Sequence, residues 1–264
     1  MKMKFIILFV ISLTTLLACK KDNDESTNGV LGGNRDFTPE TYKDFLFGQL
    51  GNLNSLLVIE STNNLTNNYS DTTTNGWNQF FNSISASTGK DLSGFPTTTV
   101  NGVTVPVARV DLSEDVDKII LTDGEEDAYF GTYVSITAFG ACGKMYIPQK
   151  IFIYEPVPDN QNPAYTPTLV ARDTPIVIRW NQDSKSRGVV IEFEYFDFLT
   201  GQTLTYSEGT EDDGEYTVPS SWLSTIPIYE NFTIKIVRGN YHVANQEDYI
   251  GGFASAIIYL RLSN

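Results

Sequence analysis

Apolar and polar residues alternate with a period of two over the C-terminal third of the chain. In residues 189–195 the odd positions are all apolar, and Glu192 and Glu194 stand between them. Residues 232–236 and 256–262 alternate in the same way. Successive side chains of a strand point to opposite faces of a sheet, so this pattern predicts strands with one buried face. Such strands, separated by polar turns, predict an antiparallel β-sandwich of about seven or eight strands.

The middle of the chain carries further strand and turn signals. Asn101-Gly102 separates the short β-branched runs 98–100 and 103–105, and Asn-Gly is the strongest short-range signal for a hairpin turn. Residues 129–137 and 144–154 predict two more extended segments. The fold class predicted for the whole chain is therefore all-β, built of antiparallel sandwich modules.

The sequence of residues 39–94 predicts its secondary structure less clearly. Leucines and a phenylalanine at mixed three- and four-residue spacings in 39–59 favour a helix, although Gly48 and Gly51 weaken it. Residues 55–60 fit a strand nearly as well. The stretch 61–94 is rich in Asn, Thr, Ser and Gly. We expect long surface loops there, with one short helix or strand around its aromatic residues.

Four parts follow from these patterns. We expect residues 1–18 to be a lipoprotein signal peptide. Residues 19–36 are polar and glycine-rich and have almost nothing to bury, so we expect them to form a disordered tether. An N-terminal β-rich domain is expected over 37–155 and a C-terminal sandwich over 164–264. Three prolines between them make a stiff connector, which could also be a long loop inside one large sandwich.

The first residues have the composition of a secretory signal. Lys2 and Lys4 precede the apolar run 5–11, and small or apolar residues continue to Ala18. The uncharged stretch ends at Cys19 and has 15 residues, whereas a helix that spans a bilayer needs about 20. We therefore predict export with removal of this segment, and cleavage between Ala18 and Cys19.

The Leu-Leu-Ala-Cys sequence at 16–19 resembles the lipobox of bacterial lipoproteins. The resemblance implies that the Cys19 thiol carries diacylglycerol and that acyl chains such as palmitate hold the protein in a membrane. Residues 20–25, Lys-Lys followed by acidic residues, resemble the surface-export signal of lipoproteins from gliding and gut Gram-negative bacteria. This resemblance implies an outer-membrane protein exposed on the cell surface, the alternative being one that faces the periplasm.

Charge and composition exclude several classes of function. Without residues 1–18 the chain has 16 Lys and Arg against 32 Asp and Glu, which argues against nucleic acid as a partner and against docking on anionic membranes by charge. His242 is the single histidine and no GxSxG turn is present, so His-based catalysis and His-rich metal sites are disfavoured. We expect no cofactor, no metal and no enzymatic activity. Cys142 lies among small and apolar residues, and we expect it to be buried.

Two acidic clusters, at 123–127 and 211–215, have oxygen ligands of the kind calcium takes, but neither has EF-hand spacing. We interpret them as acidic turns at strand ends. Glu192 and Glu194 share one face of a strand and are the starting point for a carboxylate-based glycoside hydrolase. The favoured alternative is cross-strand ion pairing with cations on neighbouring strands, namely Lys235 and Arg261.

Aromatic residues in the polar loop offer a glycan site. Tyr69 and Trp77, surrounded by Asn and Thr, would form a platform for stacking a sugar ring, or alternatively a small local core. Asp71-Thr72-Thr73 resembles the O-glycosylation pattern of exported proteins in these bacteria, and that resemblance implies Thr72 as the acceptor. Trp180 and Trp222 are assigned to the sandwich interior.

The C-terminal part resembles the immunoglobulin-like or fibronectin-like modules of surface lipoproteins. Residues 179–183, 188–191, 212–219 and 237–241 carry this resemblance, which implies a fold and says almost nothing about function. The leading hypothesis is a non-enzymatic surface lipoprotein for adhesion, envelope assembly or ligand capture, with a glycan or an envelope protein as partner. The alternative is a glycan-binding accessory of an outer-membrane uptake system, and a carboxylate-based hydrolase is the least favoured.

Overall fold

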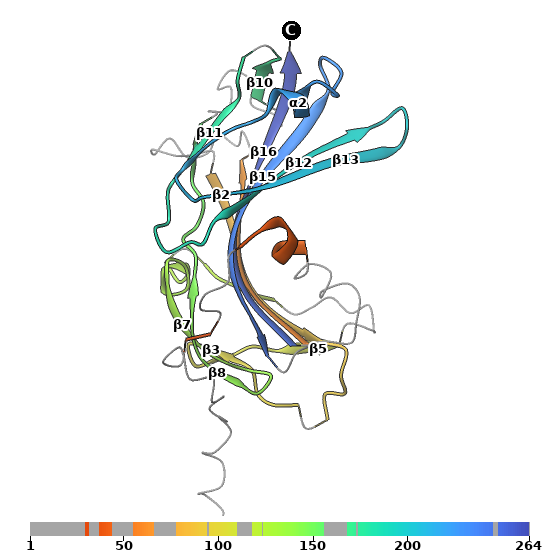
Figure 1. The fold of residues 1–264 in the computed structure, drawn as a ribbon. Coiled ribbons are helices and arrows are strands. Elements are labelled where there is room, and N and C mark those ends of the chain that lie inside the picture. The colour runs from red at the N-terminus through yellow and green to blue at the C-terminus, as the bar shows by residue number, and fades with distance from the viewer. Residues whose placement is uncertain are drawn as a thin grey trace, which may run out of the picture.

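The chain folds almost entirely into β-strands, as the alternation predicts (Figure 1). The computed structural model describes residues 30–31, 37–43, 55–65, 78–93, 95–109, 118–122, 124–155, 168–172, 174–244 and 248–263. In chain order its strands are β1 (Ser55–Leu65), β2 (Asn78–Thr88), β3 (Thr99–Val100), β4 (Val103–Thr104), β5 (Val107–Arg109), β6 (Lys118–Ile120), β7 (Thr132–Ala138), β8 (Ala141–Ile147), β9 (Ile153–Glu155), β10 (Thr168–Ala171), β11 (Val177–Trp180), β12 (Val189–Asp197), β13 (Gln202–Thr210), β14 (Glu215–Thr217), β15 (Asn231–Ala244) and β16 (Asp248–Ser263). The helical parts are 39–43, η3 (Glu126–Ala128) and α2 (Ser220–Leu223).

The C-terminal strands form the predicted sandwich. One sheet has the order β13-β12-β15-β16, with β10 parallel to the far end of β16, and the facing sheet has the order β14-β11-β9. Counted from β10, the second and fifth strands (β11 and β14) pair on one sheet, and the third, sixth and seventh (β12, β15 and β16) pair on the other, as in immunoglobulin domains. Trp180 and Trp222 both lie in the core between the sheets, as expected.

A long hairpin extends this module into the rest of the molecule. β15 and β16 pair from Asn231↔Arg261 to Ala244↔Asp248, well beyond the edge of the sandwich. Along its first half, β16 pairs in parallel with β1, from Leu56↔Tyr249 to Asn64↔Ile257. β2 continues the sheet beside β1, and β5 and β6 flank β2. Strands from before and after the proline-rich boundary at 155–164 therefore belong to one continuous sheet.

A second core lies under this extension. The small sheet β4-β3-β7-β8 covers it, and a cluster that includes Leu57, Ile59, Ile84, Ile136 and Ile147 fills the space between. The two halves of the chain therefore have separate cores and share one sheet. We name them the upper module (β9 to β16) and the lower module (β1 to β8 with the start of β16).

Two residues of the expected tether pack against the lower module. Val30 forms a parallel bridge with Lys144 of β8, and the Leu31 amide donates to the Lys144 carbonyl over 2.7 Å. Leu31 is buried in the lower core. The chain is therefore held on the molecule from Val30, before the expected end of the tether at residue 36.

Several local predictions are confirmed. Asn101 and Gly102 have φ angles of 49° and 79° and connect β3 to β4, which is the type I′ pattern expected of Asn-Gly. His242 is an ordinary residue of β15, as expected. Within 39–59, the structure has helix at 39–43 and strand from Ser55, so each reading holds for part of the range.

The expected strand around the aromatic residues of 61–94 is present as β2. Two other predictions are wrong. The loops expected in the rest of 61–94 give way at 61–65 to the end of β1, which pairs with β2 despite a polar sequence, because each strand completes the hydrogen bonds of the other. Cys142 is exposed, because it shares a face of β8 with exposed Lys144, opposite buried Ala141 and Met145. No helix in the described part of the chain is long and apolar enough to cross a membrane.

Candidate functional site

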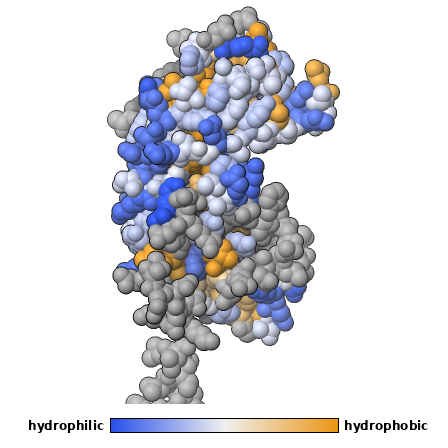
Figure 2. All heavy atoms as spheres, in the orientation of Figure 1, coloured by the Kyte–Doolittle hydropathy of each residue, from blue (hydrophilic) through white to orange (hydrophobic). Residues whose placement is uncertain are grey.

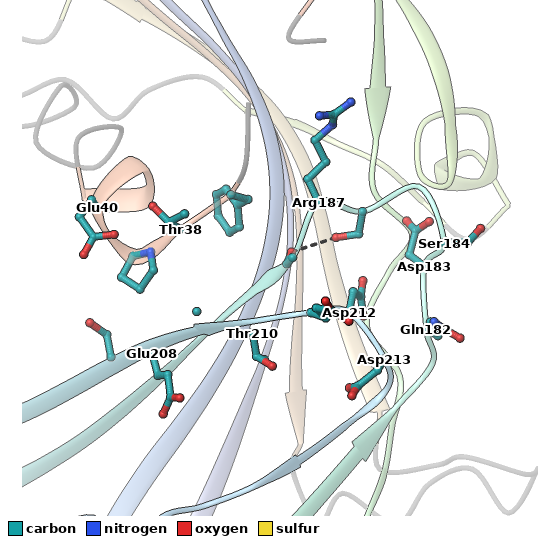
Figure 3. Close-up of a pocket in the computed structure, with 17 residues that line it drawn as sticks. Thr38, Glu40, Gln182, Asp183, Ser184, Arg187, Glu208, Thr210, Asp212 and Asp213 are labelled. Carbon is teal, nitrogen blue, oxygen red and sulfur yellow. Dashed lines mark hydrogen bonds between the residues drawn. The ribbon is translucent and has the colours of Figure 1, made fainter. Parts of the chain in front are cut away.

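A cavity of about 950 Å³ opens at the side of the upper module. Residues 37–40, 182–184, 186–188 and 207–213 line it. They come from the start of the short helix, the loop between β11 and β12, and the end of β13 (Figure 3). Segments far apart in the sequence therefore make one concave surface, which is the candidate binding site.

The wall at 37–40 is set by a helix cap and by two glycines. The Thr38 amide donates to Thr41 Oγ1 over 2.8 Å, and the Thr41 amide donates to Thr38 Oγ1 over 3.3 Å, which satisfies amides at the helix start. A Cβ at Gly188 would lie 3.2 Å from the Phe37 carbonyl, and one at Gly209 would lie 3.0 Å from Pro39 Cδ. Glycine at both positions lets this segment approach the sheet.

The floor of the cavity rests on a buried charge cluster. Arg238 of β15 is fully buried, and its Nη1 lies 3.3 Å from Asp212 Oδ2 and 3.9 Å from Asp183 Oδ2. Both aspartates line the cavity and are themselves buried. One guanidinium therefore lies close to two carboxylates and offsets part of the cost of burying them.

Hydrogen bonds fix these groups in place. Trp180 Nε1 donates to Asp212 Oδ1 over 2.8 Å, and Arg238 Nη2 donates to the Asn181 carbonyl over 2.5 Å. The Tyr146 hydroxyl, from β8 of the lower module, donates to Asp183 Oδ2 over 2.9 Å. Burial raises the pKa of Asp212, although the Arg238 charge opposes this, and burial lowers the pKa of Arg238. These contacts hold the aspartates and Arg238 together under the cavity, although Arg238 Nε and Nη1 and Asp212 Oδ2 are buried without a hydrogen-bond partner.

The rim is acidic. Glu40, Glu208, Glu211 and Asp213 are exposed lining residues, and Arg187 is the one cation among the described residues that line the cavity. Hydroxyls of threonine and serine and the amide of Gln182 lie between the carboxylates. Carboxylates only accept hydrogen bonds when ionised, so the surface suits a ligand rich in donors, such as a hydroxylated or cationic molecule.

The site residues expected from the sequence fall elsewhere. Ala18, Cys19, Tyr69, Thr72 and Trp77 all lie outside the described residues. The cleavage site, the lipid attachment, the glycan platform and the O-glycosylation site therefore stay predictions.

The carboxylate pair lies on the face of the upper sheet against which Tyr42 packs, and neither glutamate is among the residues that line the cavity. Glu192 is the cross-strand partner of Lys235, and their charged groups are 3.9 Å apart. Lys235 Nζ also donates to the Tyr42 hydroxyl over 2.8 Å. Arg261 instead donates to the Tyr229 carbonyl over 2.7 Å. Cross-strand pairing is therefore confirmed for Lys235. The expectation for Arg261 is wrong because Arg261 lies on β16, and β15 separates this strand from the glutamates of β12.

The acidic clusters make internal contacts. Glu125 accepts from the Thr122 amide and hydroxyl, and Glu126 pairs with Lys150 over 3.0 Å. In the second cluster, Asp212 pairs with Arg238 and Glu215 pairs with Arg179. Within the described ranges, no group of three or more His, Cys, Asp or Glu residues is arranged to hold a metal ion.

Sequence reasoning missed Arg238, Asp183 and Asp212 as a site. A signal was available, because three of the four stretches that resemble immunoglobulin-like modules, 179–183, 212–219 and 237–241, contain these residues. A charged residue within a strand of otherwise apolar, buried residues predicts that a residue of opposite charge is buried beside it. Which partner it finds depends on how the strands pack.

Comparisons with known proteins add little. No family model and no curated protein matches this chain. Among solved structures there is a match to a chain described by the words "Structural insight into host cell surface retention of a 1.5-MDa bacterial ice-binding adhesin". The identity is 12% and the TM-score 0.21, over 80% of this chain and 66% of that one, just under two thirds of its length. A likeness this low carries no argument about fold or function.

Proposed function

We propose that this chain is a non-enzymatic lipoprotein, anchored at Cys19 in the outer membrane and exposed on the cell surface, that captures an external ligand. The lipobox-like sequence and the export-like signal support the anchor and the location. The observation that carries ligand capture is the cavity with its pre-organised floor and hydrogen-bonding rim. A rigid site costs little entropy on binding, which favours affinity for a matching ligand.

The chemistry of the lining supports binding rather than catalysis. None of the described residues that line the cavity is a histidine or a cysteine. Asp183 and Asp212 are committed to the pair with Arg238. A general base must reach a proton of the substrate, and carboxylates held in a buried ion pair are poorly suited to that task.

A glycan-binding accessory of an uptake system is the second candidate. The specific observation in its favour is the mixture of hydroxyl, amide and carboxylate groups on the rim. These are the groups that recognise sugar hydroxyls, and they disfavour an acidic sugar. Adhesion to a glycan-coated surface would use the same chemistry.

The test is a glycan array probed with the full-length lipoprotein in detergent. We expect a neutral or amino sugar to bind, and the double variant Gln182→Ala/Glu211→Ala to weaken binding about tenfold, a loss of roughly 1.4 kcal/mol. Glu194→Ala changes an exposed carboxylate that does not line the cavity, so it is the matched control and should bind normally. Trp77→Ala tests the aromatic platform. Unchanged binding by the cavity variant would contradict the assignment to this cavity.

The anchor has a separate test. Cys19→Ala should release the protein from the membrane fraction, since one cysteine carries all the acyl chains. If the variant stayed membrane-bound, the lipoprotein assignment would be wrong even if a glycan bound.

A further inference from the structure

The β12–β13 hairpin leaves the body of the upper module as a two-stranded ribbon (Figure 1). β12 pairs with β15 from Val189 to Glu194, but pairs with β13 as far as Asp197↔Gln202. From Tyr195 onward, β13 is therefore the one described strand beside β12. The turn at 198–201 stands clear of both cores.

The turn carries large apolar side chains. Phe198 is 79% exposed and Leu199 is 94% exposed, and the ring of Phe196 lies 4.8 Å from that of Phe198 in an edge-on contact. Figure 2 shows this apolar cluster at the end of a projecting arm. Single exposed apolar residues are ordinary, but a cluster on a projection marks an interaction site. We name Phe196, Phe198 and Leu199 the apolar tip.

The tip is held rigidly. Asp197 accepts from the Leu199 amide over 2.9 Å and from the Thr200 hydroxyl over 2.8 Å, and its carbonyl accepts from the Gly201 amide over 2.8 Å. Gly201 has a φ of 68°, which glycine adopts without strain. These bonds fix the backbone that presents Phe198 and Leu199, so a partner would have little ordering cost to offset.

Charge indicates what the tip touches. Residues 189–210 include Glu192, Glu194, Asp197 and Glu208 and contain no Lys, Arg or His. An acidic ribbon is repelled by anionic lipid headgroups. It is also repelled by a second copy of this chain, whose net charge is −14. The complementary surface is apolar at its centre and basic around it.

The position of the membrane anchor also favours contact between the apolar tip and a partner outside the membrane. Val30, which follows Cys19 by 11 residues, bridges to β8. Figure 1 shows β8 at the end of the molecule opposite the β12–β13 turn. With Cys19 lipidated, as the proposed function has it, the tether enters at one end and the tip lies at the other, away from the membrane that holds the anchor.

We propose that the apolar tip docks into a protein that presents an apolar pocket rimmed by Lys and Arg side chains. Phe198 and Leu199 fill the pocket, and Glu194 and Asp197 face the basic rim. This surface is distinct from the cavity, so the two can be occupied at once.

The experiment places a photo-reactive benzoylphenylalanine at Leu199 of the full-length lipoprotein on intact cells. We expect an adduct with one protein, whose cross-linked peptide is sequenced and lies in an apolar pocket flanked by Lys or Arg. The same probe at Ile120, which is 64% exposed in the lower module, should not give this adduct. Adducts with lipid alone, with a second copy of this chain, or with nothing would overturn the proposal.

Affinity for the purified partner is then measured with tip variants. Phe198→Ser/Leu199→Ser should weaken binding by about tenfold or more. Glu194→Lys should weaken it about threefold, and raising the salt from about 50 to about 500 mM should weaken it further. Ile120→Ser and the cavity variant Gln182→Ala/Glu211→Ala should bind as wild type. The proposal would be overturned if Phe198→Ser/Leu199→Ser left the affinity unchanged. It would also be overturned if neither Glu194→Lys nor added salt changed the affinity. Neither result would affect the outcome of the glycan test.

Discussion

Two aromatic residues adopt the left-handed backbone region, and they differ in what holds them there. Phe139, with a φ of 54°, is buried in the turn between β7 and β8, and its ring lies 5.9 Å from that of Phe95. Tyr229, with a φ of 71°, is 56% exposed. Such a conformation costs about 1–3 kcal/mol for a residue other than glycine. At Phe139 the burial of a ring, on the order of 3–5 kcal/mol, offsets the strain.

We therefore expect Phe139→Asn to lower the free energy of unfolding by about 2 kcal/mol, because the loss of the buried ring exceeds the relief of strain. Tyr229→Asn is the matched control: it relieves the same kind of strain with little burial to lose, and should leave stability unchanged or raise it by up to about 1 kcal/mol. Urea unfolding measures both. A more stable Phe139→Asn protein would show that strain, and not packing, dominates the turn.

At the scale of elements, the contact between β16 and β8 joins the shared sheet to the small sheet of the lower module. Gly252 of β16 lies against Ile147 of β8, and a Cβ at Gly252 would lie 2.4 Å from Ile147 Cδ1. Glycine here is required by the close approach of a neighbouring side chain, and not by a left-handed backbone. The lower core is packed around this contact.

A double-mutant cycle tests this packing. Gly252→Ala should destabilise by about 1–3 kcal/mol through overpacking, and Ile147→Val by about 0.5–1.5 kcal/mol through a lost methyl group. Because valine lacks the atom that clashes, the double variant should be more stable than the sum of the two losses predicts. Thermal or urea unfolding of the four proteins gives the coupling energy, and strict additivity would mean that β8 shifts instead.

At the scale of the whole molecule, several contacts tie the modules together, and two of them are extensive or buried. β1 and β16 pair along nine residues, and the hydroxyl of Tyr146 in β8 reaches Asp183 beside Arg238. Strands of both modules therefore depend on the buried charge cluster and on one continuous sheet. This arrangement predicts that the modules unfold together.

Arg238→Met should lower the free energy of unfolding by about 3–5 kcal/mol, because it leaves Asp183 and Asp212 buried without a cation. Amide hydrogen exchange should speed up in β7–β8 and β12–β13 alike. Arg179→Met, which removes the exposed pairs with Glu155 and Glu215, should cost less than about 1 kcal/mol. Loss of protection in the upper module alone would show that the modules are energetically separate.

The sequence by itself determined the strands and turns whose conformation depends on residues close together along the chain. The alternation at 189–195, 232–236 and 256–262 predicts β12, β15 and β16, because a strand repeats every two residues whatever it packs against. Asn101-Gly102 determines its turn for a similar local reason. The immunoglobulin-like sandwich follows from several such strands in a row.

The tertiary structure decided what depends on residues far apart. The second half of β1 and most of β2 are polar, and Asn63 at the buried face of β1 donates through its Nδ2 to the Ile151 carbonyl over 2.8 Å. The local pattern fits a strand at 55–60 but does not extend it through the polar residues up to 65, because partner strands supply the stability of that part. The exposure of Cys142 followed from the face of β8 on which it lies. The cavity floor brings together Tyr146, Asp183, Asp212 and Arg238, since burying one charge is favourable only when folding delivers its partners.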